Sequence, residues 1–164
     1  MSEVKNKKKK SSIIQVSIGV LAVIMAILII IMMGIVSDIQ GTARIVNYTG
    51  LVRGETQRLI KLELSTQQEN EMIHDIRTFI DGLRNGNDEL NLVRLNDVDF
   101  QNKMRELDDK FSDLHKKIYL VRFKGARNTD IIPESEEFFV ICDEATGLAE
   151  KYSQKKATSL SLLE

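Results

Sequence analysis

Cysteine, proline and tryptophan are almost absent from this sequence of 164 residues, which has one cysteine, one proline, no tryptophan and 5% aromatic residues. Because Cys142 is the only cysteine, no intramolecular disulfide can form, and we predict that it is a small core residue in a domain stabilised by its core alone. The scarcity of proline, together with abundant Leu, Ile, Glu, Lys and Arg, favours an all-α fold.

Catalytic and metal-binding patterns are also missing. The sequence contains no nucleophile paired with a base, no metal-ligand spacing and no phosphate-binding loop. His74 and His115 have no second histidine or cysteine one helical turn away, so we interpret both as solvated or partly buried side chains. We therefore predict that the chain is not an enzyme and binds no cofactor or metal, and that any catalytic output module lies beyond it.

One long uncharged run lies near the N-terminus. Residues 13–36 contain only two polar side chains, Gln15 and Ser17, and no charged one. A helix of 24 residues is about 36 Å long and covers a hydrocarbon core of about 30 Å, whereas the apolar part of a signal peptide has only about 7–15 residues. We predict a single membrane-spanning helix at 13–36.

Five lysines, at positions 5 and 7 to 10, precede this run. Since excess lysine marks the cytoplasmic side, we predict a cytoplasmic basic tail at 1–12 and an extracytoplasmic domain at 37–164, in a cell-membrane protein. Without the five lysines and Glu3, 18 of the 23 basic and 23 of the 24 acidic residues remain. This mildly acidic balance argues against a nucleic-acid partner.

The apolar spacing after the membrane run predicts a helix that packs along its length. Positions alternately three and four residues apart form a heptad seam, and no helix breaker separates them from the run, so we predict one continuous helix from about 13 to 66. The seam residues are Val36, Ile39, Ala43, Val46, Gly50, Arg53, Gln57, Ile60 and Leu64.

A second helix is predicted to end at the turn-forming residues 84–87, followed by a loop at 88–96 whose apolar side chains pack over the end of the bundle. The apolar residues of this helix are Ile73, Ile76, Ile80 and Leu83, and those of the loop are Leu90, Leu92, Val93 and Leu95.

A third helix is capped by Asp97 or Asp99 and ends at Gly125, and a fourth has Pro133 in its first turn. The third helix buries Phe100, Met104, Leu107, Phe111, Leu114, Ile118 and Val121 in this prediction, and the fourth presents Phe138, Cys142, Ala145, Ala149, Tyr152, Ser159 and Leu163.

Four helices with short connections predict an up-down-up-down four-helix bundle, continuous with the N-terminal transmembrane helix. In that arrangement the fourth helix returns to the membrane surface, and it has no stop signal before Glu164. Because such a helix resembles the lead-in to a second membrane span, we expect the native protein to continue past Glu164. A complete chain that ends there is the alternative.

Arg53 and Gln57 interrupt the otherwise apolar seam of the first helix, with Gly50 one turn earlier. An inward-facing arginine costs several kcal/mol unless it meets an anion or a hydrogen-bonding partner, and its guanidinium suits a planar oxyanion. Gly50 would allow another helix or a ligand to approach the backbone closely. These three residues predict a small anion pocket.

Residues 47–58 read Asn-Tyr-Thr-Gly-Leu-Val-Arg-Gly-Glu-Thr-Gln-Arg. This stretch resembles the signature of the extracytoplasmic four-helix-bundle sensor domain found in nitrate/nitrite-sensor histidine kinases and in the N-terminal domain of pilus-type methyl-accepting chemotaxis transducers. Residues 79–83 and 89–93 are similar to segments of Gram-positive membrane sensors, including histidine kinases and diguanylate cyclases.

The resemblance implies a homodimeric sensor in a bacterial signalling protein of the chemoreceptor or two-component type. Arg53 from each copy would meet a small anion at the dimer interface, Gly50 and Gln57 would belong to the same site, and Asn47 and Arg58 would support it. Gly54 and Glu55 depart from the residues usual in the nitrate sensors, so nitrate itself is not assigned.

Two alternatives stand beside the sensor. Arg53 could instead form a buried structural ion pair with an acidic residue of the third or fourth helix, such as Glu106, Asp109 or Glu144. The whole chain could be a membrane-anchored helical structural or interaction protein without a small-molecule ligand.

Overall fold

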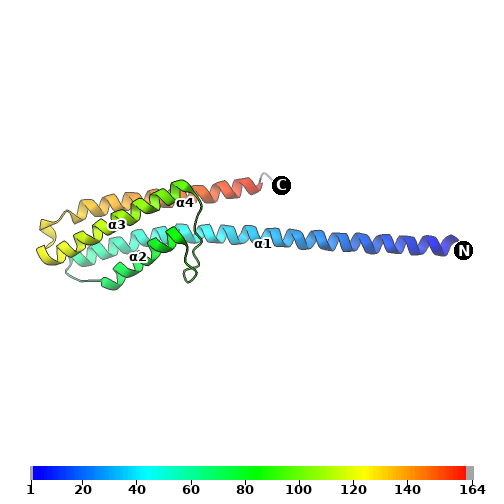
Figure 1. Ribbon diagram of the computed structural model, residues 1–164, viewed down its shortest axis with the longest axis horizontal. Coiled ribbons are helices and arrows are strands. Elements are labelled where there is room, and N and C mark those ends of the chain that lie inside the picture. Colours follow the sequence, from blue (N-terminus) through cyan, green and yellow to red (C-terminus); the bar gives the residue numbers. More distant parts are fainter. Residues whose placement is uncertain (1, 162–164) are drawn as a thin grey trace. The chain divides into compact units, whose positions relative to one another are not determined.

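A computed structural model describes residues 2–161, and the described part of the chain is all-helical, as predicted (Figure 1). The elements are α1 (Ser2–Leu64), α2 (Asn70–Asn85), α3 (Val98–Lys124), the short 3₁₀ helix η1 (Ala126–Asn128) and α4 (Ile131–Ser161). Within the described residues no strand forms, and the single extended pairing is an isolated bridge between Asn87 and Leu92.

The chain divides into two compact units, Met1–Asp38 and Ile39–Glu164. In the first unit, the apolar part of α1 has a mean hydropathy of 3.1 over its best 18-residue window, and none of that window is buried within the molecule. Apart from the half-buried Ile35, the large apolar side chains from Ile14 to Val36 are 48–69% exposed. By length and composition α1 can therefore cross a membrane. The lysine side chains of residues 1–12 lie outside those that the structure describes.

In the second unit, α3 forms the centre of a core shared by four helices. All seven residues predicted for its apolar face are buried, from Phe100 to Val121. Asp97 caps the helix, because its Oδ1 accepts the backbone N–H of Phe100 at 2.9 Å. Gly125 ends it in a conformation with φ of +77° that favours glycine. The prediction for this helix is confirmed.

The predicted seam of α1 is wrong by one residue at most of its positions, although Ile60 is buried as predicted. Ala43, Gly50, Arg53 and Gln57 are exposed. The buried positions of α1 in this unit are Thr42, Ile45, Thr49, Val52, Thr56, Leu59, Ile60 and Glu63. Three threonines seven residues apart therefore alternate with apolar side chains. The hydroxyl of Thr49 bonds to its own helix, because Oγ1 donates to the carbonyls of Ile45 (2.9 Å) and Val46 (2.8 Å). Among the described residues, the buried hydroxyl of Thr56 has no hydrogen-bond partner. Ile39 lies outside the described side chains.

Helix α2 buries the predicted residues Ile73, Ile76, Ile80 and Leu83, and the loop after it packs Leu92 and Leu95 into the core, also as predicted. Val93 is the exception, with 63% of its surface exposed. Gly82 is needed for this arrangement, because a Cβ there would lie 3.1 Å from Leu92 Cδ1 and 3.2 Å from Asn87 Cβ.

Helix α4 begins at Ile131, so Pro133 lies in its first turn. Backbone N–H groups in a first turn have no partner within the helix, so the N–H that proline lacks costs no hydrogen bond. It buries Phe138, Cys142, Ala145 and Ala149, as predicted. Ser159 and Leu163, predicted for the same face, lie outside the described side chains. The backbones of α3 and α4 pack most closely, α2 packs on α3, and α1 stays further from the other helices.

Candidate functional site

Arg53 lies on an exposed part of α1 and contacts α4. Its Nη1 is 2.8 Å from Asp143 Oδ1, and the two side chains are 44% and 56% exposed. Among the described residues this is the ion pair that Arg53 forms, so its partner is an acidic residue of the fourth helix, but not one of the three named from sequence. Glu106 and Glu144 instead share Lys103, each at 2.6 Å from Nζ.

Arg58, the second predicted arginine, faces a different direction. It lies five residues after Arg53, which places it about 140° around the helix. Its Nη1 is 3.6 Å from Glu55 Oε2, and its side chain is 65% exposed. Within one chain the structure therefore does not bring Arg53 and Arg58 to a common ligand.

Gln57 is on the same side of α1 as Arg53 and lines a cavity of ≈390 Å³ between the end of α1 and the start of α4. The residues around this cavity are Gln57, Ile60, Lys61, Leu64, Ser65, Ile132, Ser135, Glu136 and Phe139. Asn47 and Gly50 are exposed, and a Cβ on Gly50 would meet nothing within 4 Å. No helix of the same described chain makes the close approach that Gly50 would permit.

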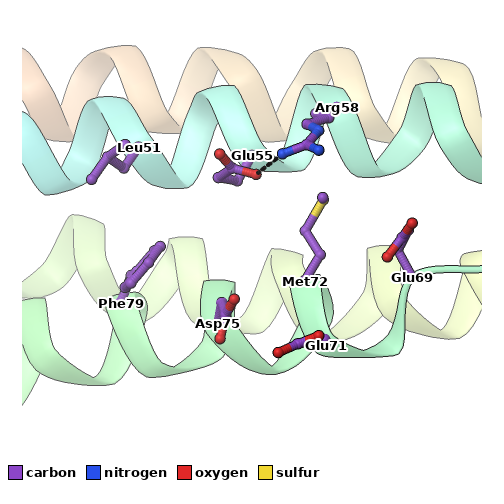
Figure 2. A pocket seen from close by; sticks show the side chains of 8 residues that line it. All are labelled: Leu51, Glu55, Arg58, Glu69, Glu71, Met72, Asp75 and Phe79. Carbon is purple, nitrogen blue, oxygen red and sulfur yellow. Dashed lines mark ion pairs between the residues drawn. The ribbon is translucent and has the colours of Figure 1, made fainter.

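A second cavity, of ≈300 Å³, lies between α1 and α2 (Figure 2). Its lining residues are Leu51, Glu55, Arg58, Glu69, Glu71, Met72, Asp75 and Phe79. Figure 2 shows Leu51 opposite Phe79, and Met72 pointing from α2 toward α1. Of the site residues predicted from sequence, only Arg58 lines this cavity. The others were chosen from a face of α1 that does not point into the bundle.

Two buried or half-buried titratable groups lie near these contacts. Burial raises the pKa of the Cys142 thiol to about 12, with a further contribution from the charge of Asp143. Cys142 is thus a protonated, fully buried side chain, as its predicted core role requires. Burial and then the charges of Arg77 and Arg122 lower the pKa of His115, whose Nδ1 lies 3.0 Å from Arg77 Nη2.

The most buried ion pair of the described residues was not predicted. Glu63 at the end of α1 and Arg122 near the end of α3 form a two-point ion pair in which the side chains are 1% and 9% exposed. Arg122 also donates to Asn70 Oδ1 at 2.7 Å. The signal available in the sequence was the heptad of Thr42, Thr49 and Thr56, which continues to Glu63.

Within the residues that the structure describes, no group of three or more His, Cys, Asp or Glu side chains could hold a metal ion. Comparison with protein-family models, with curated proteins and with solved structures gave no match.

Proposed function

We propose that this chain is the extracytoplasmic, ligand-sensing input part of a bacterial transmembrane signalling protein of the histidine kinase, chemoreceptor or diguanylate cyclase type. In this proposal the N-terminus is cytoplasmic, residues 13–36 span the membrane, and α1 continues directly into an up-down-up-down bundle. A ligand would shift α1 against α4, and the motion would pass through the membrane to an output module beyond this chain.

The polar character of the α1 seam is the observation that carries the proposal. The backbones of α3 and α4 pack more closely than that of α1 on either helix, and the seam of α1 buries three threonines among its apolar side chains. Its contact with α4 includes the half-exposed pair of Arg53 and Asp143. Because a solvated ion pair and small polar side chains contribute less to packing energy than large apolar ones, we expect α1 to shift at lower cost than α3 or α4.

The exposed side of α1 supports a homodimer. Cβ atoms placed on Gly50 and Gly54 would each meet nothing within 4 Å, although each glycine costs the helix about 1 kcal/mol relative to alanine. A second copy that approaches this surface would give these glycines a role. Gly50, Arg53 and Gln57 would then face their counterparts, and the two arginines could share a small oxyanion. Asn47 and Arg58 are about 20° apart around the helix, and both lie at the edge of this face.

Ligand-induced stabilisation of the full chain in uncharged detergent micelles tests the anion site. Melting temperatures are measured with a panel of small oxyanions and carboxylates, for the wild type, for Arg53→Ala and for the matched control Arg44→Ala, an exposed arginine on the same helix. A ligand at 100 times its dissociation constant stabilises the folded form by about 2.7 kcal/mol. We expect one anion to raise the melting temperature of the wild type and of Arg44→Ala, and to leave Arg53→Ala unchanged.

A membrane-anchored interaction protein without a small-molecule ligand is the second candidate, because Asp143 already supplies an anion to Arg53. The interaction protein is favoured if no anion raises the melting temperature and if Arg53→Ala only lowers the stability of the fold. Reading the coding frame beyond Glu164 separates the two candidates further. Continuation into a second apolar run supports the sensor, and a stop codon supports the interaction protein.

A further inference from the structure

The cavity between α1 and α2 has an apolar side and a charged side. Leu51 from α1 and Met72 and Phe79 from α2 supply its apolar walls (Figure 2). The rings of Tyr48 on α1 and Phe79 on α2 meet edge to face, with centroids 5.3 Å apart, and link the two helices beside it. Its volume of ≈300 Å³ is within the range of about 300–1,000 Å³ found for small-molecule sites.

Negative charge dominates the polar lining of this cavity. Its lining has four carboxylates, those of Glu55, Glu69, Glu71 and Asp75, and one guanidinium, that of Arg58, which is paired with Glu55. Among the described residues, Glu69, Glu71 and Asp75 form no ion pair. Three carboxylates without a cation therefore line the α2 side, and a positive charge placed among them would be attracted by all three.

The spacing of these carboxylates does not suit a metal ion. They do not converge, since no group of three or more acidic, histidine or cysteine side chains among the described residues could hold a metal ion. Apolar side chains lie between them along α2. An elongated molecule can meet the carboxylates with its charged end and cover Leu51, Met72 and Phe79 with its apolar body.

We propose that this cavity binds an organic cation with an apolar body, such as an arylalkyl or alkyl ammonium compound. This site does not include Arg53. Binding there would name the ligand class of the proposed sensor, so its role in signalling rests on the proposed function. Because the backbones of α1 and α2 do not pack closely, a molecule that bridges them would hold α1 in one position.

Titration calorimetry on the full chain in uncharged detergent micelles tests this assignment. The probes are phenethylammonium, its neutral analogue 2-phenylethanol, and methylammonium, which carries the charge without the apolar body. We expect phenethylammonium to bind at least about tenfold more tightly than either of the others. Higher salt should weaken its binding because carboxylate attraction is screened.

Two variants locate the site. The double substitution Glu71→Gln with Asp75→Asn removes charge without removing volume and should weaken phenethylammonium binding by about tenfold or more. Glu150→Gln, an exposed carboxylate on α4, should leave the affinity unchanged. Leu51→Ala should weaken binding through the apolar wall, and circular dichroism checks that every variant is folded.

Equal binding of 2-phenylethanol, unchanged affinity in the double variant, or no binding of phenethylammonium at millimolar concentration would each overturn the proposal. The result is independent of the anion site, because Arg53→Ala should retain phenethylammonium binding. Loss of the oxyanion response with retained amine binding contradicts only the anion site of the proposed function. The reverse pattern contradicts only the cation site.

Discussion

Glu63 and Arg122 tie the end of α1 to the end of α3 through two parallel contacts. Arg122 Nε donates to Glu63 Oε2 at 2.9 Å, and Nη2 donates to Oε1 at 2.5 Å. Glu63 Oε1 also accepts the backbone N–H of Glu69 at 3.2 Å, so the carboxylate positions the connection to α2. Hydrogen bonding to Glu63 raises the pKa of Arg122 above its ordinary value. This buried pair fixes the C-terminal end of α1, whereas the Arg53–Asp143 pair, earlier in the same helix, is half-exposed to solvent.

Glu63→Gln should destabilise the folded chain strongly. It leaves the buried guanidinium of Arg122 without its counter-charge, and removal of one partner from such a pair costs about 3–5 kcal/mol. Replacing both residues together, Glu63→Leu with Arg122→Met, should recover much of this loss. Chemical denaturation followed by circular dichroism measures both. Asp113→Asn, which breaks the exposed pair with Lys116, is the control and should change stability little. Equal stability of Glu63→Gln and wild type would show that the pair is not structural.

Thr56→Val should stabilise the fold. Thr56 is fully buried, and among the described residues its hydroxyl has no hydrogen-bond partner. An unsatisfied buried polar group costs about 1–3 kcal/mol, and valine has the same shape without it, so we expect a gain of about 1 kcal/mol. Thr49→Val is the matched control at the neighbouring heptad position, and it should be neutral or destabilising because Thr49 donates to two carbonyls. A loss of stability in Thr56→Val would contradict the buried, unpaired hydroxyl.

Folding stability should fall as the pH drops through the titration of His115. The pKa of His115 in the folded chain lies below 6.5 because of burial and of the nearby Arg77 and Arg122. The unfolded chain therefore binds more protons in the interval between that value and 6.5, so stability is complete above this interval and decreases as the pH falls through it. Denaturation midpoints measured across this range should show a smaller slope for His115→Gln. The exposed His74→Gln is the control. Identical slopes for wild type and His115→Gln would refute the prediction.

Cys142 should resist alkylation in the folded chain. Its thiol is fully buried, and its pKa is raised to about 12, so the reactive thiolate is scarce and inaccessible. We expect labelling by iodoacetamide to be slow under native conditions and fast in denaturant, as followed by mass spectrometry. Asp143→Asn, which removes a neighbouring charge but not the burial, should leave native labelling slow. Rapid native labelling would show that α4 opens readily.

Gly82→Ala should destabilise the fold although alanine favours helices. The added Cβ would lie 3.1 Å from Leu92 Cδ1 and 3.2 Å from Asn87 Cβ, and such overpacking costs about 1–3 kcal/mol. At Gly147 on α4 a Cβ would meet nothing within 4 Å. Gly147→Ala should therefore add about 0.5–1 kcal/mol from helix propensity alone. Opposite signs in the two unfolding free energies confirm that the loop after α2 packs on Gly82.

Local patterns in the sequence determined the elements of this fold. The spacing of apolar residues predicted α2, α3, the loop after α2 and the buried face of α4, because each has large apolar side chains on one face and a turn or cap residue at its ends. The uncharged run at 13–36 indicated a helix that can cross a membrane by composition alone. Cys142 was correctly predicted to be buried for the same reason, since it follows Phe138 by one turn.

Only the tertiary structure decided which face of α1 is inside and what its polar residues contact. Sequence reasoning placed Arg53 on the inner seam of α1, whereas the buried seam lies one residue earlier and includes Thr49, whose hydroxyl bonds to its own helix. Sequence reasoning did not identify Asp143 as the ion-pair partner of Arg53. It also did not identify Arg122 as the partner of Glu63, which lies 59 residues earlier in the chain. Such pairings depend on the rotation of each helix about its axis, and that rotation is set by how the helices pack against one another, which no single helix encodes.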